Sequence, residues 1–226
     1  MAISLAGAVN APGSGAATTS FSTNVPAGVL NNDLLLWTLH GNTVTSAATP
    51  TGWTPWTLNT ATGVNQSTFY RWASGEPASY TATLSSNRWG GSMLALRGVD
   101  MTTPQDVTFP AAINGTTAIT FPAITPVTAG AWILAAASLI GPTGVVDYTF
   151  GLGNLAALDC DAGTDNAGTT NTFICIGHQL WTSGAFTPTG PALSAQATTR
   201  TIGATWALRP APAAAPAFEG WGVPIA

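Results

Sequence analysis

Charged side chains are scarce in this chain, and lysine is missing altogether. Asp, Glu, Lys and Arg together make up 6% of its 226 residues, against about a quarter in typical globular proteins. Proteins that bind nucleic acids neutralise phosphates with clustered Lys and Arg side chains. Since the few positive charges here are scattered, the sequence predicts no nucleic-acid partner. The whole basic inventory, apart from histidine, is Arg71, Arg88, Arg97, Arg200 and Arg209.

Long apolar runs, an export signal and cysteines are also scarce. The longest apolar run, residues 131–140, has about half the length that crosses a bilayer. The first residues lack the basic start and apolar core of a secretory signal. We therefore expect a protein made in a cytoplasm, without a membrane partner. Under those conditions Cys160 and Cys175 are expected to be free, buried thiols, with a disulfide between them as the alternative.

The pattern of apolar residues favours strands over helices throughout. Short apolar or alternating runs are separated by clusters of Gly, Pro, Asn, Thr and Ser, and no stretch keeps a helical period. Thr, Val and aromatic residues, which suit half-buried pleated surfaces, are frequent. The sequence predicts an all-β protein with strands at 33–39, 67–72, 80–84, 91–97, 132–138, 172–177 and 202–208.

The two halves of the chain show the same order of landmarks, which indicates an internal duplication. Each half offers about four strands, and together they give the roughly eight strands of a jelly-roll-like sandwich. The offsets between matched landmarks are 104, 112 and 112 residues for Phe69 with Phe173, Arg88 with Arg200, and Leu96-Arg97 with Leu208-Arg209.

These observations predict one antiparallel two-sheet sandwich over residues 21–209, built from related halves at about 21–107 and 118–209. Two separate four-stranded domains are the alternative, less favoured because each would bury too little apolar surface. An N-terminal arm is expected over residues 1–20. A second arm, rich in Pro and Ala, is expected over residues 210–226.

Residue types that carry chemistry are few and poorly arranged. His40 and His178 are the only histidines, and neither has another ligand at metal spacing, so both are expected to be structural or surface residues. Asp159, Asp161 and Asp165 could converge on calcium, but the spacing misses the known loop pattern, so a solvated loop tip is favoured. We predict no catalytic residues, no metal and no cofactor.

The tryptophans have two readings. Those inside apolar strands, Trp37, Trp132 and Trp206, are predicted core residues. Trp53 and Trp56 stand in a Pro/Gly-rich loop, where an aromatic face can stack on a sugar ring or fill a neighbouring pocket. A structural plug is the commoner role. The candidate glycan-stacking residues are Trp53, Trp56 and Tyr70.

The expected C-terminal arm alternates large apolar residues with small ones. Its Ala-Pro repeats favour an extended conformation that has little entropy left to lose on binding. We predict that this arm docks onto a partner, with Phe218, Trp221, Val223 and Ile225 as anchors.

Five motifs follow one another in the first half of the chain. They are P-A-G-x-x-x-x-D-L-L-L at 26–36, P-x-G-W at 50–53, F-Y-R-W-A-S-G-E-P-A-S-Y-T-A-T at 69–83, L-R-G-V-D at 96–100 and P-Q-D-V at 104–107. Together they resemble a β-sandwich module of tailed-phage virion proteins, especially minor tail proteins of phages that infect actinobacteria. The resemblance covers residues 22–107. The second half departs from it, because Gly130-Ala131 stand where the Asp of the D-L-L-L strand is expected.

This resemblance implies a non-enzymatic virion component, in contact with other virion proteins and with copies of itself. A minor tail protein is the leading expectation. A capsid decoration or head-fibre protein is one alternative, and a carbohydrate-binding module that attaches the particle to host glycan is another.

Overall fold

The computed structural model describes residues 1–11, 13–14, 16–43, 45–116, 118–141, 150–163, 171–190, 192–193 and 200–213. Within these ranges all regular structure is β-strand, and every strand pair is antiparallel. None of these residues belongs to a helix long and apolar enough to cross a membrane. The predicted all-β class is confirmed, and all seven predicted strands are present.

Two five-stranded sheets form the body of the molecule, and each comes from one half of the chain. The first has the spatial order β1 (Ser4–Ala11), β7 (Trp89–Arg97), β3 (Leu34–Gly41), β5 (Val64–Trp72) and β4 (Thr54–Ala61). The second has the order β8 (Ile113–Gly115), β14 (Arg200–Leu208), β9 (Trp132–Gly141), β12 (Asn171–Leu180) and β11 (Ala157–Gly163).

Two short ribbons complete the strand set. They are β2 (Thr18–Asn24) with β6 (Ser79–Asn87), and β10 (Phe150–Gly151) with β13 (Ala192–Leu193).

The strand orders of the two sheets correspond one to one, as an internal duplication requires. β1, β7, β3, β5 and β4 match β8, β14, β9, β12 and β11 in the same sequence of neighbours. In each half, the central strand (β3 or β9) comes after the first strand (β1 or β8) along the chain. The last strand of the half (β7 or β14) then lies between those two strands in the sheet. The duplication is therefore visible in the topology as well as in the landmarks.

The register corrects one of the landmark pairs. The matched leucines Leu96 and Leu208 lie opposite Leu34 on β3 and Trp132 on β9, so these two positions are equivalent. On their other side, Leu34 lies opposite Trp72, and Trp132 lies opposite Leu180. Counting back three residues along each partner strand, Phe69 corresponds to Gly177 rather than to Phe173. The repeat pattern in the sequence pairs Phe69 with Phe173, but these two aromatic residues occupy different register positions in their sheets.

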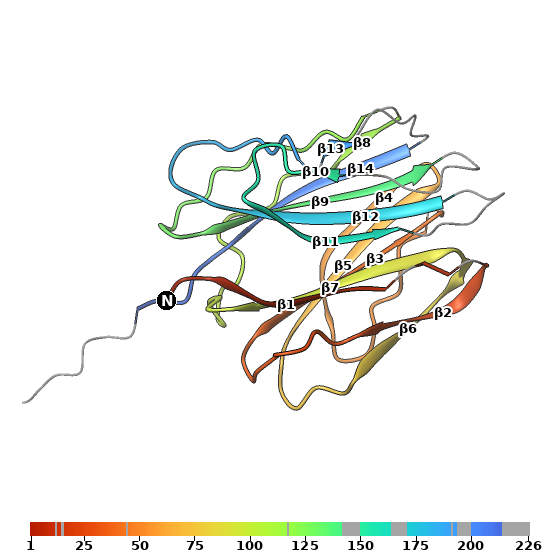
Figure 1. Cartoon of the computed structure of the whole chain (residues 1–226), viewed down its shortest axis with the longest axis horizontal. Helices are drawn as coiled ribbons and strands as arrows, with labels where there is room; N and C mark the ends of the chain where they lie inside the picture. The colour runs from red at the N-terminus through yellow and green to blue at the C-terminus, as the bar shows by residue number, and fades with distance from the viewer. Residues whose placement is uncertain are drawn as a thin grey trace, which may run out of the picture.

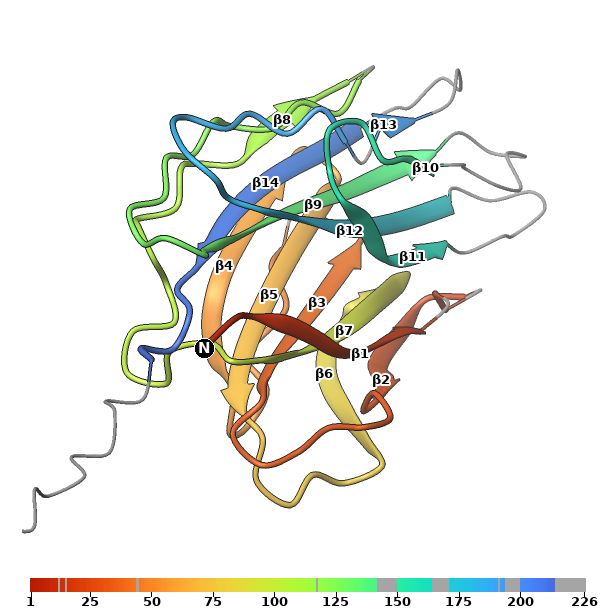
Figure 2. The ribbon, with the colours of Figure 1, turned by 60° about the vertical axis from the view of Figure 1, so that its left-hand side comes forward.

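A shared apolar core lies between the two sheets. Leucines of β3 and β7 meet Leu134, Trp206 and Leu208 of the second sheet, and all are at most 1% exposed. Figures 1 and 2 show the two sheets stacked face to face, with the second half above the first. Because residues of both halves form this one cluster, the sandwich is a single packing unit.

The outer face of each sheet is covered as well. The β2–β6 ribbon places Phe21 and Leu84 over Trp37 and Met93 of the first sheet. On the second sheet, loop residues such as Phe121 and Phe186 cover the outward residues of β9 and β12. Burial on both faces explains why the central strands are apolar at consecutive positions instead of alternating.

Residues 1–20, expected as an arm, are mostly part of the sheets. β1 pairs with β7 along its length, Ile3 is only 5% exposed in the inter-sheet core, and β2 begins at Thr18. The segment was missed because its Ala- and Gly-rich sequence has weak strand propensity. Its order comes from the exposed edge of β7, which offers unpaired backbone groups.

Polar side chains lie between the sheets at one end of the core. The Gln66 amide on β5 donates to the Ser138 hydroxyl at 3.0 Å and to the Ala136 carbonyl at 3.2 Å, both on β9. In the same layer the hydroxyls of Thr38 and Thr68 are 3.0 Å apart. Since these groups are fully buried, a one-residue slip of either strand would leave them without partners.

Gln66→Ala should lower the free energy of unfolding by about 1–3 kcal/mol, because it leaves the buried Ser138 hydroxyl without this partner. The matched control, Gln179→Ala, removes the same group from a half-exposed site and should change stability by less than about 0.5 kcal/mol. Urea denaturation followed by tryptophan fluorescence measures both. Equal effects of the two variants would contradict the inter-sheet role of Gln66.

Candidate functional site

The predicted docking residues of the C-terminal arm, Phe218, Trp221, Val223 and Ile225, lie outside the described residues. The structure does describe the root of the arm, residues 210–213. Three hydrogen bonds to backbone carbonyls hold this root. The antiparallel bridge between Val99 and Pro210 consists of two of them: the Ala211 N–H donates to the Gly98 carbonyl at 2.7 Å, and the Asp100 N–H donates to the Arg209 carbonyl at 2.9 Å. In the third, the Met1 nitrogen donates to the Ala211 carbonyl at 2.6 Å.

These contacts bring three distant parts of the chain to one end of the sandwich. The crossing segment, residues 98–112, leads from β7 to β8. It meets the chain start and the end of β14 beside the N label in Figure 2. Gly98 has φ +80°, and a side chain there would clash with the Ala2 carbonyl. A glycine is therefore required where the crossing segment passes the N-terminus.

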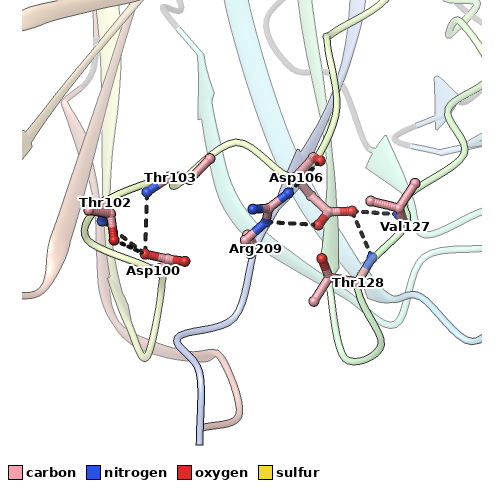
Figure 3. A network of polar contacts seen from close by, with 7 residues as sticks. All are labelled: Asp100, Thr102, Thr103, Asp106, Val127, Thr128 and Arg209. Carbon is pink, nitrogen blue, oxygen red and sulfur yellow. Dashed lines mark hydrogen bonds and ion pairs between the residues drawn. The ribbon is translucent and has the colours of Figure 1, made fainter.

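An ion pair fastens the crossing segment to Arg209 at the end of β14, directly before the arm root (Figure 3). The Arg209 guanidinium donates from Nε to Asp106 Oδ1 at 3.3 Å and from Nη2 to the Asp106 carbonyl at 3.2 Å. The second carboxylate oxygen accepts the backbone N–H groups of Val127 at 2.6 Å and Thr128 at 3.2 Å. One buried carboxylate thus joins three segments: the crossing segment, the loop before β9 and the end of β14.

The first half has an equivalent clasp. Arg97, at the end of β7, binds Asp33 through Nε at 2.9 Å and Nη2 at 2.8 Å, and Asp33 also accepts the Leu30 N–H at 2.8 Å. In the second half no Asp stands at the corresponding sequence position. The carboxylate comes instead from Asp106 in the P-Q-D-V segment, a substitution in space that sequence matching along the repeat does not reveal.

The surroundings of Asp106 favour its ionised form. Burial by itself would raise the pKa of this carboxyl. Hydrogen bonds from the Thr128 hydroxyl, from two backbone N–H groups and from the Arg209 guanidinium outweigh burial and hold the pKa below its ordinary value. Nearby, hydrogen bonds from the Thr102 hydroxyl and backbone lower the pKa of Asp100 (Figure 3).

A cleft of about 410 Å³ opens between the start of β1 and the second sheet. The ring of His178 stacks on Trp132 with the centroids 4.0 Å apart and the planes 4° from parallel. His178 Nδ1 lies 2.7 Å from the carboxylate of Asp159, whose side chain is 1% exposed. The cleft is lined by Ala2, Ile3, Gly130, Trp132, Ala156, His178 and Leu180.

The polar side chains at this cleft are the carboxylate–imidazole pair of Asp159 and His178. A carboxylate–imidazole pair is part of many hydrolytic sites, but there it acts on a nucleophile within hydrogen-bond reach. None of the other described residues lining the cleft carries a hydroxyl, thiol or amine side chain. Trp132, predicted to be core, is half-buried and forms one wall, while Trp37 and Trp206 are buried as predicted.

The candidate glycan-stacking residues do not form one platform. Trp53 is 6% exposed and packs in the outer layer of the first sheet against Trp37 and Tyr80, with ring centroids 5.3 and 5.1 Å away. Trp56 and Tyr70 pack instead against the inter-sheet core, on the other face of the sheet. Trp53 also lines a surface pocket of about 220 Å³, and Trp56 is half-buried.

A network that the sequence reading missed surrounds Trp53. Arg71 lies over the rings of Tyr80 and Trp53, 5.1 and 5.9 Å from their centroids, and its guanidinium is 3.3 Å from Glu76. Glu76 also accepts hydrogen bonds from the Tyr80 hydroxyl and the Ser74 N–H. Burial and the Glu76 carboxylate raise the pKa of Tyr80 to about 12. The sequence feature that could have predicted this network is the spacing of Arg, Glu and Tyr in R-W-A-S-G-E-P-A-S-Y at residues 71–80.

The aspartates considered for calcium are only partly described. Asp159 is engaged by His178, and Asp165 lies outside the described residues. Among described residues, no three His, Cys, Asp or Glu side chains gather as a metal site. The β11–β12 register sets Cys175, which is buried, opposite Asp161, and Cys160 opposite Ile176.

Asp106→Asn should destabilise the protein by about 2–4 kcal/mol at neutral pH, because it breaks a buried ion pair. The folded-state pKa of Asp106 lies below its unfolded value of about 3.9. Its contribution is therefore complete above about pH 4 and is lost as pH falls through the folded-state pKa. Urea denaturation at a series of acidic pH values should show that the free energy of unfolding changes less with pH in the variant than in the wild type.

Asp100→Asn serves as the control for this experiment. Asp100 lies in the same segment and accepts hydrogen bonds from Thr102, but it forms no ion pair among the described residues. Its loss should cost about 1 kcal/mol or less. A wild-type pH profile in the Asp106 variant would show that the clasp does not contribute to stability.

Tyr80 should resist ionisation until about pH 12, two units above the ordinary value of 10.0. Its stabilising contribution is complete below about pH 10 and is lost as pH rises through 12, because the unfolded state releases the phenol proton first. Phenolate absorbance of the wild type minus that of Tyr80→Phe isolates this titration. Glu76→Gln should shift it downward, and an unchanged titration would exclude Glu76 as a cause.

Comparison of the chain with protein-family models, with curated proteins and with solved structures found no match.

Proposed function

We propose that this protein is a non-enzymatic structural subunit of a tailed-phage virion, attached to the tail as a minor tail protein. In this proposal the sandwich packs beside other virion proteins and copies of itself. The C-terminal arm carries the docking residues Phe218, Trp221, Val223 and Ile225. The observation that carries the proposal is the root of the arm, which is fastened to the junction of the two halves.

The anchoring of the root has a mechanical consequence. A pull on residues beyond Ala213 acts on backbone hydrogen bonds to Gly98 and on the Arg209–Asp106 clasp, not on a free loop. Those bonds join β14, the crossing segment and the chain start. Load on the arm is therefore spread over both sheets, which suits a subunit held in an assembly by its terminus.

The motifs that resemble virion proteins supply architecture rather than chemistry. Asp33 of the D-L-L-L motif and Arg97 of L-R-G-V-D form the first clasp. Arg71, Glu76 and Tyr80 of the third motif bind one another. Because these polar side chains already have structural partners, they support a role without catalysis.

The low charge supports a crowded setting. A net charge of -4 over 226 residues gives little electrostatic repulsion between copies. Neighbours in a symmetric assembly can then approach closely without desolvating many charges. The same composition is unfavourable for a freely diffusing protein at high concentration.

Particles of the phage that encodes this chain provide the test. We expect the protein in the mass spectrum of gradient-purified particles, and antibody-bound gold at the tail in electron micrographs. Gold on the head would replace the tail assignment with capsid decoration or a head fibre. Presence only in the soluble lysate, with none in purified particles, would refute a virion role.

A further inference from the structure

The cleft at Trp132 and His178 is an apolar surface left open beside the arm root. Leu180 at its rim is 48% exposed, and Ala156 is exposed as well. Exposed apolar surface that gathers in a concave site marks an interaction site. The volume of about 410 Å³ is in the range of pockets that enclose a large side chain or small ligand.

The walls of the cleft are held in place before anything binds. Asp159 is buried beneath His178, and both carboxylate oxygens lie within 2.9 Å of Nδ1. The ring is thereby oriented flat against Trp132. A site whose aromatic walls are already ordered loses little entropy when an occupant enters.

The chain leaves the sandwich at the edge of this cleft. Gly130 lines the cleft, and a Cβ built on it would lie 3.9 Å from the ring of Pro210. Ala2 also lines the cleft and directly follows Met1, which donates to the Ala211 carbonyl. The thirteen residues 214–226 start three residues beyond that carbonyl and include Phe218 and Trp221.

We propose that this cleft receives Phe218 or Trp221 from residues 214–226 of a second copy of the chain. The inference rests on the proposed function, because it names the partner of the docking arm. An aromatic ring matches the flat, mostly apolar walls formed by Trp132, His178 and Leu180. Such aromatic anchors in preformed pockets dominate the binding energy of interfaces.

The composition of the arm favours a neighbouring copy over the arm's own cleft. Pro210, Pro212 and Pro216 favour an extended chain, and the first glycine of the arm, Gly220, comes only after Phe218. This argument therefore applies to Phe218, whereas Trp221 directly follows that glycine. Five residues from Ala213 reach at most roughly 17 Å to Phe218, and eight reach roughly 28 Å to Trp221. In the proposed assembly, this reach carries the aromatic rings onto a subunit packed beside the first. When each copy docks its arm into the cleft of the next copy, the repeated contact builds a ring or a filament.

Photo-cross-linking of the full-length protein tests the proposal. Phe218 is replaced by p-benzoylphenylalanine in a ¹⁵N-labelled preparation, which is mixed with unlabelled wild type and irradiated. Mass spectrometry should find cross-links that join the two isotopes and map to residues 2–3, 130–132, 156 or 178–180. The same replacement at Trp221 covers the other anchor.

Variants at the rim distinguish binding in the cleft from nonspecific association between copies. Leu180→Ser in the unlabelled partner should lower the yield of mixed-isotope cross-links at least about fivefold. Leu58→Ser is the matched control, because Leu58 on β4 is similarly exposed at 46% and lies outside the cleft. Circular dichroism and urea denaturation confirm that both variants are folded.

Three results would overturn the proposal: cross-links confined to one isotope, cross-links to another surface, or no cross-links at either position. Equal yields with Leu180→Ser and Leu58→Ser would do the same. None of these outcomes touches the particle analysis, so the docking proposal can fail while the virion role stands. If the protein were absent from particles, mixed-isotope cross-links at the cleft would still establish that the arm of one copy docks into the cleft of another.

Discussion

Packing of one sheet against the other is the interaction on which the rest of this structure depends. Each half contributes one five-stranded sheet, and the inward residues of β3 and β7 share one apolar cluster with residues of β9, β12 and β14. Alone, either sheet would expose that face to water. The contact also fixes where Gln66 crosses to Ser138 and where the two chain ends meet. The clasps and the cleft lie at the ends of this interface.

The two clasps show how a duplicated fold keeps an interaction while changing the residue that supplies it. In both halves an Arg at the end of the last strand binds a buried Asp, and that Asp accepts backbone N–H groups from the loop before the central strand. Asp33 comes from its own repeat, whereas Asp106 comes from the end of the first repeat, where the chain crosses to the second. The second clasp therefore closes the half and also ties it to the first.

The candidate sites depended on long-range packing to different degrees. His178 was expected to be structural, and its ring is indeed oriented by Asp159, but the wall that it builds with Trp132 needs β1 opposite. Trp53 and Trp56 are three residues apart along the chain, yet they pack on opposite faces of the sheet. The register of β4 shifts between Pro55 and Thr57, close to where the two side chains diverge. They end in different layers, against Tyr80 and Phe109 respectively.

The sequence by itself determined the all-β class, seven strands and the duplication, because apolar patterning and turn residues act over a few neighbours along the chain. Tertiary structure decided which distant segments complete them. β1 joined the sheet because β7 offered a free edge, and Asp106 replaced a missing carboxylate because the crossing segment passes Arg209. Such pairings depend on positions about a hundred residues apart, which local patterns do not encode.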